Sequence, residues 1–515
     1  MTNLPPNSTP LLQDSTPARS TGGTLLETVA RNTAAMLAGQ GLIKVFAFVF
    51  SVYVVRRLGA AHFGRYAAAL AYVGIFAMFT DLGTSSLSVR EMARKEENIS
   101  WMVPDIIALR AILSLAAITA IILSSWLLGK GSDMMLGIFI ASCGLLLYAF
   151  QGPLNSVMIA RERLDFSSAF GLLNQVVFMI LGTILLLAGM GYIGLLLASL
   201  AGVLAMGLAS ARVARRVLGL HFERPAPHRW WPLLRASFPF GVAGTVWEFA
   251  GRFDTVFMSF VLTDAAVGWY NVPYNLIMMM LLLAQSLTLS MYPTLIKEYD
   301  SGRGSIHNTV QRALRYLLLL SLPIAIGGML LADRIVLLLY GQEFVPAIPV
   351  MQILVWTLPP MFLAEILGRT SSTMHLEKKA ARISTISALV GVILDLALIP
   401  GWGVIGAAVA MVLARLGRVI LLSAIVGPTM LFKENTIPML RVVGAGTLMG
   451  SAVWLASQAG FLTTLDDKIV LLLLVGIGIV VYGAASLLLK AISPGEARYV
   501  YGLTARGLGR LVRRK

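Results

Sequence analysis

The chain is a succession of long apolar segments, each long enough to cross a lipid bilayer as a helix. A membrane-spanning helix needs about 20 mainly apolar residues, because in lipid every backbone polar group must find its hydrogen bond inside the segment. Runs of at least ~18 such residues recur about fourteen times, which predicts an all-α polytopic membrane protein. The expected spans are residues 33–55, 64–86, 104–127, 134–159, 166–189, 191–211, 237–261, 266–293, 311–332, 346–371, 380–400, 402–426, 439–459 and 468–490.

The composition agrees with this fold class and argues against several kinds of function. Hydrophobic residues make up 57% of the chain and charged residues 13%, against roughly 25% charged residues in soluble domains. The single cysteine, Cys143, cannot form a disulfide within the chain. The five histidines lack the paired spacing of zinc sites, and no nucleic-acid-binding motif accompanies the net charge of +16. We therefore expect no cofactor, no metal and no nucleic-acid partner.

The positions of Lys and Arg predict the orientation of the chain in the membrane. With the N-terminus in the cytoplasm, most of the 41 basic residues fall in the tails and the even-numbered loops, on the side that positive charge favours. Both termini are therefore expected to be cytoplasmic. The connections on the opposite side are short, which leaves no room for an external catalytic domain. This argues against a glycan polymerase or ligase, and we expect a protein that is not an enzyme.

Three polar segments on the expected cytoplasmic side divide the chain. Residues 1–32 are expected to be a disordered tail, because most of this segment is rich in Thr, Pro, Ser and Gly. Residues 217–236 are an expected interlobe loop, in which Trp230, Trp231 and several arginines suit either contact with anionic lipid or a solvated linker. Residues 491–515 are a basic tail whose arginines alternate with Tyr and Leu, a pattern typical of a helix on anionic lipid.

The chain also contains a loose internal repeat. A shift of 204 residues places Glu248, Leu262, Ala265, Gly268 and Tyr270 on Lys44, Leu58, Ala61, Gly64 and Tyr66. A second correspondence relates residues 191–205 to residues 403–417. Repeats of this kind are common in transporters, where the substrate site lies between the halves. The expected organisation is an N-lobe of six helices at 33–216, a C-lobe of six helices at 237–430 and two further helices at 431–490.

Four segments, in order, resemble the polysaccharide flippases of the multidrug, oligosaccharidyl-lipid and polysaccharide export superfamily. They are residues 56–73 (RRLGAAHFGRYAAALAYV), 79–94 (FTDLGTSSLSVREMAR), 252–277 (RFDTVFMSFVLTDAAVGWYNVPYNLI) and 394–414 (LDLALIPGWGVIGAAVAMVLA). The resemblance implies export of a lipid-linked oligosaccharide, on an undecaprenyl diphosphate carrier, across the inner membrane of a bacterium or archaeon. It also implies alternating access of the two lobes, with glycan-assembly proteins as candidate partners.

Four basic residues within the expected spans are candidates for binding a diphosphate: Lys44, Arg252, Arg369 and Arg415. Such a cargo needs cations, and a guanidinium group can bind two phosphate oxygens at once. Charges at bilayer depth are costly and usually functional. A fifth basic residue, Arg110, lies near the start of its span and is expected instead to extend toward the headgroups.

Four acidic residues are candidates for ion coupling or charge balance: Glu248, Asp254, Asp395 and Asp81. Glu248 lies four residues before Arg252 and can neutralise it, and Glu365 has the same spacing to Arg369. Asp395 stands where many members of the resembling family carry Asn. Asp81 suits a cap or a pair with the loop that holds Arg90 and Arg94. Coupling to Na⁺, to H⁺ or to the membrane potential stays open, and we hypothesise that Lys44 and Glu248 face each other across a cleft.

Two other transport functions stay open at this point. A multidrug exporter of the same superfamily would need an acidic, aromatic cavity, whereas basic residues outnumber the clearest acids within the expected spans. A flippase for the peptidoglycan precursor would share both the fold and the diphosphate chemistry.

Overall fold

The computed structural model describes residues 22–301, 305–427, 436–458 and 466–491, and every regular element within these ranges is a helix. This confirms the predicted fold class. The N-terminal segment 1–21 and the basic tail 492–515 lie outside the described residues. The long helices are α1 (Gly22–Asp81), α2 (Thr84–Arg94), α3 (Asn98–Leu127), α4 (Ser132–Ala160), α5 (Leu164–Leu187), α6 (Gly191–Arg216), α7 (Trp230–Val261), α8 (Asp264–Asp300), α9 (Ser305–Leu330), α10 (Ala332–Tyr340), α11 (Ala347–Leu354), α12 (Leu358–Thr373), α13 (Glu377–Val426), α15 (Thr436–Ser457) and α16 (Asp467–Leu488).

Two of these helices are bent at a glycine. Gly59 in α1 has φ 72° and Gly403 in α13 has φ 57°, a backbone region that glycine adopts at little cost. Each bend separates two apolar segments that were expected as separate spans. Within the described ranges, 11 helices are long and apolar enough to cross a membrane, each bent helix counting once. The chain is therefore a multi-pass membrane protein, and the count of about fourteen spans stays a prediction.

The expected span 346–371 is built from two helices rather than one. α11 ends at Leu354, a 3-10 turn follows over Val355–Thr357, and α12 begins at Leu358. Pro359 and Pro360 lie in the first turn of α12. Backbone N–H groups in a first turn have no partner within the helix, so proline can stand there without loss of a helical hydrogen bond. The prolines therefore start a new helix instead of disrupting a continuous one.

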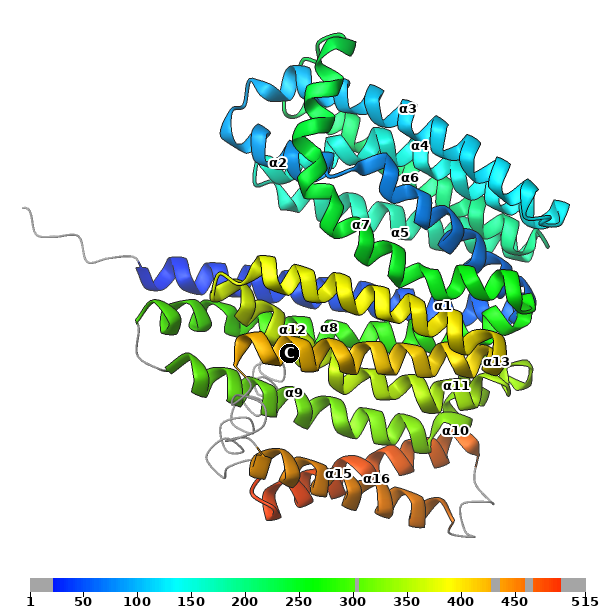
Figure 1. The fold of residues 1–515 in the computed structure, drawn as a ribbon, viewed down its shortest axis with the longest axis vertical. Helices are drawn as coiled ribbons and strands as arrows, with labels where there is room; N and C mark the ends of the chain where they lie inside the picture. Colours follow the sequence, from blue (N-terminus) through cyan, green and yellow to red (C-terminus); the bar gives the residue numbers. More distant parts are fainter. Residues whose placement is uncertain (1–21, 302–304, 428–435, 459–465, 492–515) are drawn as a thin grey trace, which may run out of the picture. The chain divides into compact units, whose positions relative to one another are not determined.

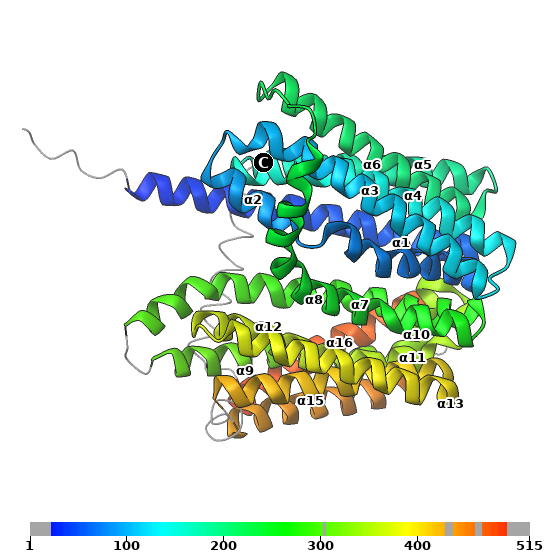
Figure 2. The ribbon, with the colours of Figure 1, turned by 45° about the horizontal axis from the view of Figure 1, so that its top comes forward.

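The chain divides into two compact units, residues 1–51 and residues 52–515. The first contains the beginning of α1. In the second, α3, α4, α5 and α6 pack side by side, and we call them, with α2 and residues 60–81 of α1, the first bundle (Figures 1 and 2). α8, α9, α11, α12 and α13 share another hydrophobic core, α10 packs against α11 and α9, and we call these helices the second bundle. The predicted lobe boundaries have no independent test here and stay a prediction.

Helix α7 contacts both bundles. Near its start, a Cβ built on Gly241 would lie 2.6 Å from the backbone carbonyl carbon of Leu82, at the turn between α1 and α2. Its last turns pack against α13 of the second bundle. Helix α7 is therefore in contact with both bundles along its length.

The segment between α6 and α7 packs against α3. This packing differs from both expectations for the loop, contact with anionic lipid and a solvated linker. The backbone N–H of Ala226 donates to the carboxylate of Asp105 at 2.5 Å, and Asp105 is fully buried in α3. Leu218, Leu220 and Phe222 pack against the core of the first bundle. The loop also ends earlier than expected, because α7 begins at Trp230.

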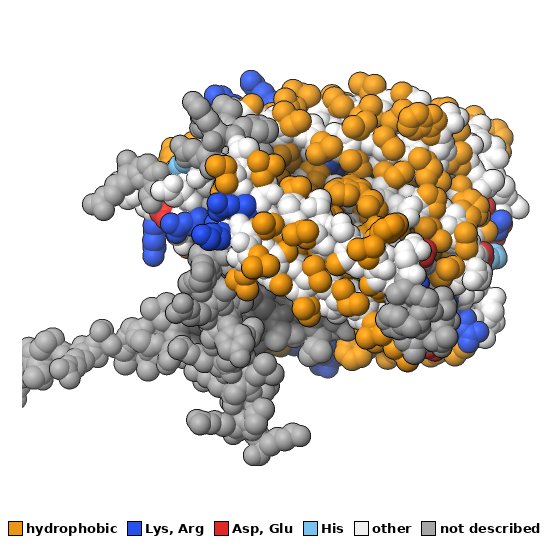
Figure 3. All heavy atoms as spheres, turned by 90° about the horizontal axis from the view of Figure 1, so that it is seen from below, with side chains coloured by type: hydrophobic (Ala, Val, Ile, Leu, Met, Phe, Trp, Pro, Cys, Tyr) orange, Lys and Arg blue, Asp and Glu red, His pale blue; other side chains and the backbone are white. Residues whose placement is uncertain are grey.

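The last two helices attach to the second bundle mainly through α9. Gly446 and Gly450 lie one turn apart on α15, and a Cβ at either would lie 2.8 or 2.9 Å from the Ile326 side chain of α9. Small residues at this spacing let helices approach closely in lipid. α15 and α16 also carry exposed hydrophobic side chains, Leu440 and Leu472 among them. Figure 3 shows a face whose middle is covered mainly by hydrophobic side chains, with Lys and Arg near its left and right edges.

Candidate functional site

Two glycines bring the two bundles into backbone contact. A Cβ built on Gly64 of α1 would lie 1.8 Å from the carbonyl oxygen of Asp264, and one on Gly268 of α8 would lie 2.2 Å from the carbonyl oxygen of Ala60. The shift of 204 residues that relates the repeats also relates Gly64 to Gly268 and Ala60 to Asp264. The contact is therefore reciprocal, and such a close approach of two backbones requires glycine at both positions.

Arg65, beside this crossing, forms ion pairs with both bundles. Its Nη1 lies 2.7 Å from Oδ2 of Asp133 at the start of α4, and its Nε lies 2.8 Å from Oδ2 of Asp264 at the start of α8. The Tyr192 hydroxyl donates to the backbone carbonyl of Asp133 at 2.8 Å. The charged side chains are one-third to one-half exposed, so each pair contributes about 1 kcal/mol or less. These pairs can hold the bundles together and still break readily.

Two loops add contacts across the same crossing. The Lys130 Nζ, between α3 and α4, donates to the carbonyl of Ser259 at 2.5 Å and lies 4.0 Å from the centre of the Phe260 ring. Burial lowers the pKa of Lys130. From the second bundle, Glu343 accepts a hydrogen bond from the N–H of Ala60 at 2.7 Å, which caps the helix after the α1 bend. We call this set the interlobe junction: Gly64, Arg65, Lys130, Asp133, Asp264, Gly268 and Glu343.

A group of charged residues lies inside the second bundle. Asp254 of α7 is 8% exposed and accepts hydrogen bonds from the Tyr270 hydroxyl at 2.5 Å and from the Thr255 N–H at 2.6 Å. Asp395 of α13 is 6% exposed and lies within electrostatic range of Asp254. Arg415, also of α13, interacts with the same carboxylate. Two carboxylates and one guanidinium group thus come together, and we call Asp254, Tyr270, Asp395 and Arg415 the second-bundle cluster.

A second group lies inside the first bundle. Arg110 of α3 is buried, forms an ion pair with Asp81 and donates to the Thr84 hydroxyl at 2.7 Å and the Ser85 hydroxyl at 2.8 Å. Gly152 of α4 makes room, because a Cβ there would lie 2.6 Å from Arg110 Nη1. The expected extension of Arg110 toward the headgroups is therefore wrong: its hydrogen bonds are made inside the protein. We call Asp81, Thr84, Ser85 and Arg110 the first-bundle cluster.

Asp81 caps α2 in addition to pairing with Arg110. Its carboxylate accepts hydrogen bonds from the Ser85 N–H at 3.1 Å and the Ser85 hydroxyl at 2.9 Å. The basic partner seen for Asp81 is Arg110 of α3, whereas Arg94 contacts Glu91 on its own helix. The geometry of Asp81 is that of a structural group.

Arg369 is paired on its own helix and reaches a neighbouring one. Its Nη2 lies 3.0 Å from Glu365, four residues earlier on α12, and its Nε donates to the Thr288 hydroxyl of α8 at 3.0 Å. Arg418 of α13 lies within electrostatic range of the same glutamate. Both members of the Glu365–Arg369 pair are about a quarter exposed, so they remain accessible to a polar ligand.

Arg252 of α7 lies against the first bundle. A Cβ built on Gly74 of α1 would lie 2.6 Å from Cδ, Nε and Nη1 of Arg252, so this glycine leaves the space that the guanidinium group fills. The side chains of Lys44 and Glu248 lie outside the described residues. The hypothesis that these two face each other therefore stays a prediction.

The charged residues of the interlobe junction have no signature of their own in the sequence. The repeat marks Gly64 and Gly268, which supply the close approach, but Asp133 lies in the first turn of α4 and Glu343 in the 3-10 turn Gln342–Phe344, both far from Gly64 in the sequence. Arg65 directly follows the repeated glycine Gly64 in the sequence, and this adjacency was the available signal for a charged residue at the junction.

The comparison with known proteins decides the family. The family described as "Polysaccharide biosynthesis protein" matches residues 29–299, which include α7, most of α8 and both junction glycines. The chain belongs to this family. A second family, described as "Lipid II flippase MurJ", matches residues 234–476 of this polysaccharide biosynthesis protein.

Two relatives carry names that describe transport in glycan biosynthesis. The "Probable low-salt glycan biosynthesis flippase Agl15" of Haloferax volcanii is 24% identical over 380 residues, which cover 71% of this chain and 77% of the relative. The "Probable flippase AglR" of the same organism is 28% identical over 178 residues, 33% of this chain and 37% of the relative. The chain is therefore similar, over most of its length, to a protein named as a flippase of glycan biosynthesis. Its relatives are flippases and transporters, in agreement with the expectation that it is not an enzyme.

Solved structures share the fold. A "Lipid II flippase MurJ, inward closed conformation" superposes with a TM-score of 0.69 at 16% identity, covering 87% of this chain and 97% of that chain. An inward-facing multidrug resistance MATE family transporter of the MOP superfamily gives a TM-score of 0.55 at 16% identity, covering 75% and 96%. Together with the two family matches and the relative Agl15, this shared fold confirms the predicted membership of the multidrug, oligosaccharidyl-lipid and polysaccharide export superfamily.

Proposed function

We propose that this protein moves a lipid-linked oligosaccharide, carried on undecaprenyl diphosphate, from the inner to the outer leaflet by alternating access of its two bundles. The observation that carries the proposal is the position of Arg252, a guanidinium group of α7 that lies against Gly74 of the first bundle. A cation between two moving bodies suits a cargo whose head is a diphosphate.

Arg369 is the second candidate for the diphosphate. Its partner Glu365 already neutralises part of its charge, so a bound phosphate would compete with the Glu365 carboxylate for the same guanidinium group. Such competition suits transport, because a cation that is paired again after release holds its cargo only transiently. Lys44 remains a candidate from the sequence, and Arg415 shares its charge with Asp254 in the second-bundle cluster.

The interlobe junction supports the alternating-access part of the proposal. Its backbone crossing and ion pairs close one side of the protein between the bundles, and cargo can leave there only after they separate. The ion pairs of Arg65 are weak enough to break in each cycle. With the termini in the cytoplasm of a bacterium or archaeon, as basic residues indicate, the junction closes the external side.

The second-bundle cluster is the proposed coupling site. Asp254 and Asp395 bring two negative charges and Arg415 one positive charge, so binding of H⁺ or Na⁺ would balance the cluster. Because α7 also contacts the first bundle, a change at Asp254 can bias the position of both bundles. Glu248 is a further candidate for charge balance. Basic cytoplasmic segments are proposed to contact anionic lipid, and glycan-assembly proteins are the proposed protein partners.

The proposal is tested first by transport itself. Purified protein is reconstituted into vesicles that hold a fluorescent undecaprenyl diphosphate oligosaccharide, and the externally exposed fraction is followed with a membrane-impermeant quencher. Arg252→Ala and Lys44→Ala are expected to reduce the flipping rate at least about tenfold, the effect of one lost charge-assisted contact of roughly 1.5–3 kcal/mol. Normal transport by both variants, at equal reconstitution, would exclude the assigned cation sites.

The junction has its own test. Gly64→Ala places a methyl group against the Asp264 carbonyl and is expected to stop the bundles from closing, so that transport falls to background. Gly327→Ala, where a Cβ would meet nothing within 4 Å, is the matched control and should transport normally. Equal transport by the two variants would contradict closure at this crossing.

A second candidate function is favoured by one finding, the match of residues 234–476 to the lipid II flippase family. Lipid II transport would use the same cations and the same junction. Rescue of a strain depleted of its own lipid II flippase would support this function. Accumulation of a cytoplasm-facing lipid-linked oligosaccharide in a deletion strain, without rescue of the depleted strain, would support the oligosaccharide. Unchanged drug accumulation in the same deletion strain would exclude a multidrug exporter.

A further inference from the structure

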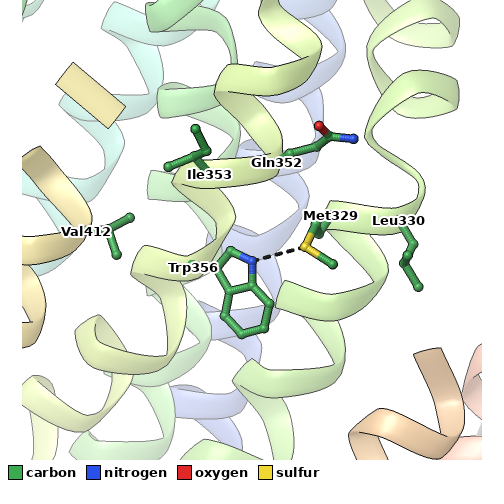
Figure 4. A pocket seen from close by; sticks show the side chains of 6 residues that line it. All are labelled: Met329, Leu330, Gln352, Ile353, Trp356 and Val412. Atoms are coloured by element: carbon green, nitrogen blue, oxygen red, sulfur yellow. Dashed lines mark hydrogen bonds between the residues drawn. The ribbon is translucent and has the colours of Figure 1, made fainter. Parts of the chain in front are cut away.

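A cavity of about 550 Å³, largely open to its surroundings, lies in the second bundle among α9, α11, the turn Val355–Thr357 and α13 (Figure 4). Its volume falls in the range of about 300–1,000 Å³ that is typical of small-molecule sites. None of its lining side chains is charged, and none belongs to the two clusters or to the interlobe junction. The lining residues are Met329, Leu330, Gln352, Ile353, Trp356 and Val412, and we call this space the Trp356 cavity.

Two hydrogen-bond donors line this otherwise apolar space. Gln352 is exposed, and the structure gives its amide no hydrogen-bond partner among the residues it describes. The indole N–H of Trp356 donates to the sulfur of Met329 at 3.2 Å, and a thioether is a weak acceptor. A polar group that faces lipid without a partner is costly. The cavity thus offers two donors to a ligand that brings oxygen acceptors and apolar surface.

The depth of these donors suits a membrane lipid. α11 begins at Ala347, directly after the turn Gln342–Phe344, and a helix rises about 1.5 Å per residue. Gln352 therefore lies roughly 8 Å along the helix from its start, and Trp356 about one turn deeper. The headgroup and interfacial layer occupies roughly 5–8 Å on each side of the hydrocarbon core. The Gln352 amide is thus near the level where ester groups meet acyl chains.

We propose that the Trp356 cavity binds one acyl chain of a bilayer phospholipid, with its ester carbonyl oxygen on the donors of Gln352 and Trp356. The uncharged lining favours a neutral ester over a diphosphate, so the occupant is a resident lipid and not the transported cargo. The site is separate from the cations assigned to transport, so it can be tested without a transport assay.

The test uses photolabelling of the full-length protein in nanodiscs of phosphatidylcholine. A trace of phosphatidylcholine with a diazirine near the ester end of one acyl chain is activated by light, and labelled residues are mapped by mass spectrometry. Labels are expected to concentrate on Met329 and residues 352–356. Gln352→Leu should lower this labelling about fivefold, the change expected for one hydrogen bond.

A matched pair of variants tests the cavity itself. Val412→Phe fills the space, whereas Leu413→Phe adds the same ring at the next position of α13, where the side chain is 46% exposed and outside the lining. Labelling is expected to fall at least about fivefold in the first variant only. Equal labelling of both variants, or labels spread over α5 and α16 in proportion to exposed surface, would overturn the proposal. Should Val412→Phe fail to fold, Gln352→Leu decides alone, because it changes one exposed side chain.

A competition experiment distinguishes the two sources of a hydrocarbon chain. Excess undecaprenyl diphosphate is added before irradiation. Unchanged labelling supports a resident phospholipid. Selective loss of label from the cavity would assign the site to the cargo chain and overturn the proposal.

Discussion

The two charged clusters use similar chemical groups but differ in burial and in the pairing of their acids: the Asp81 side chain is 42% exposed, whereas Asp254 and Asp395 are buried. In the first-bundle cluster, Arg110 faces Asp81 and the hydroxyls of Thr84 and Ser85. In the second-bundle cluster, Asp254 lies within electrostatic range of both Asp395 and Arg415, and the Tyr270 hydroxyl donates to Asp254. Arg418 lies within electrostatic range of Arg415.

On this difference we propose a structural role for the first-bundle cluster and a transport role for the second-bundle cluster. A buried charge that loses its partner costs several kcal/mol, so a paired and hydrogen-bonded arginine suits a permanent part of the fold. Two buried carboxylates side by side repel each other, so H⁺ or Na⁺ can stabilise them and, in the proposed cycle, bind and leave. The positions of the two acids on α7 and α13 allow that charge to act on helix packing.

The largest expected effect is the loss of stability when the balanced cluster is broken. Asp81→Asn leaves the buried guanidinium group of Arg110 without its charged partner and is expected to cost about 3–5 kcal/mol. Thermal unfolding of the purified protein in detergent measures the effect. The double variant with Arg110→Leu should recover most of the loss, because both charges are then gone. Wild-type stability of the single variant would contradict a structural role for this pair.

The second-largest effect is expected on the flipping rate, with little change in stability. Asp254→Asn removes one acid of the second-bundle cluster but keeps an oxygen that can accept from the Tyr270 hydroxyl, so the unfolding temperature should fall only slightly while flipping falls to background. Vesicle flipping and thermal unfolding are measured on the same preparation. The control is Asp165→Asn, an exposed carboxylate paired with Arg163, which should change neither. A large fall in unfolding temperature for Asp254→Asn would remove the contrast between the clusters.

An intermediate effect on stability and transport is expected when the Asp254 carboxylate keeps its charge but loses one hydrogen-bond donor. Tyr270→Phe removes the hydroxyl that donates to Asp254 at 2.5 Å. A hydrogen bond to a charged group contributes about 1.5–3 kcal/mol, so stability and transport should both decrease. Ion dependence of flipping is the deciding measurement: the variant should need a different proton or sodium concentration for half-maximal rate. An unchanged ion dependence would argue that Asp254 is not part of the coupling site.

The smallest effect is expected within the balanced cluster. Ser85→Ala removes one neutral donor from Asp81 and one acceptor from Arg110, while the ion pair remains. A loss of about 0.5–1.5 kcal/mol of stability is expected, with a normal flipping rate in the folded fraction. Impaired flipping at normal stability would show that the first-bundle cluster also takes part in transport.

Individual residues show how far sequence reasoning reached. Asp254, Asp395 and Arg415 were each predicted as candidates, because a charge within a long apolar segment is costly wherever the helix lies. Their meeting in one cluster was not predictable, since they lie on α7 and α13. Arg110 was assigned to the headgroups, because its position near the start of a span is visible in the sequence while the space left by Gly152 is not.

The sequence by itself determined that this chain is a helical membrane protein with an internal repeat, and four segments indicated its superfamily. Those properties follow from local rules, because apolar length decides whether a segment spans lipid and glycine marks close backbone approach. The tertiary structure alone decided which charges are paired, which loops complete the interlobe junction and where Gln352 meets a cavity. Ion pairs and hydrogen bonds act over about 3–4 Å, so they depend on which helices become neighbours and not on spacing along the chain.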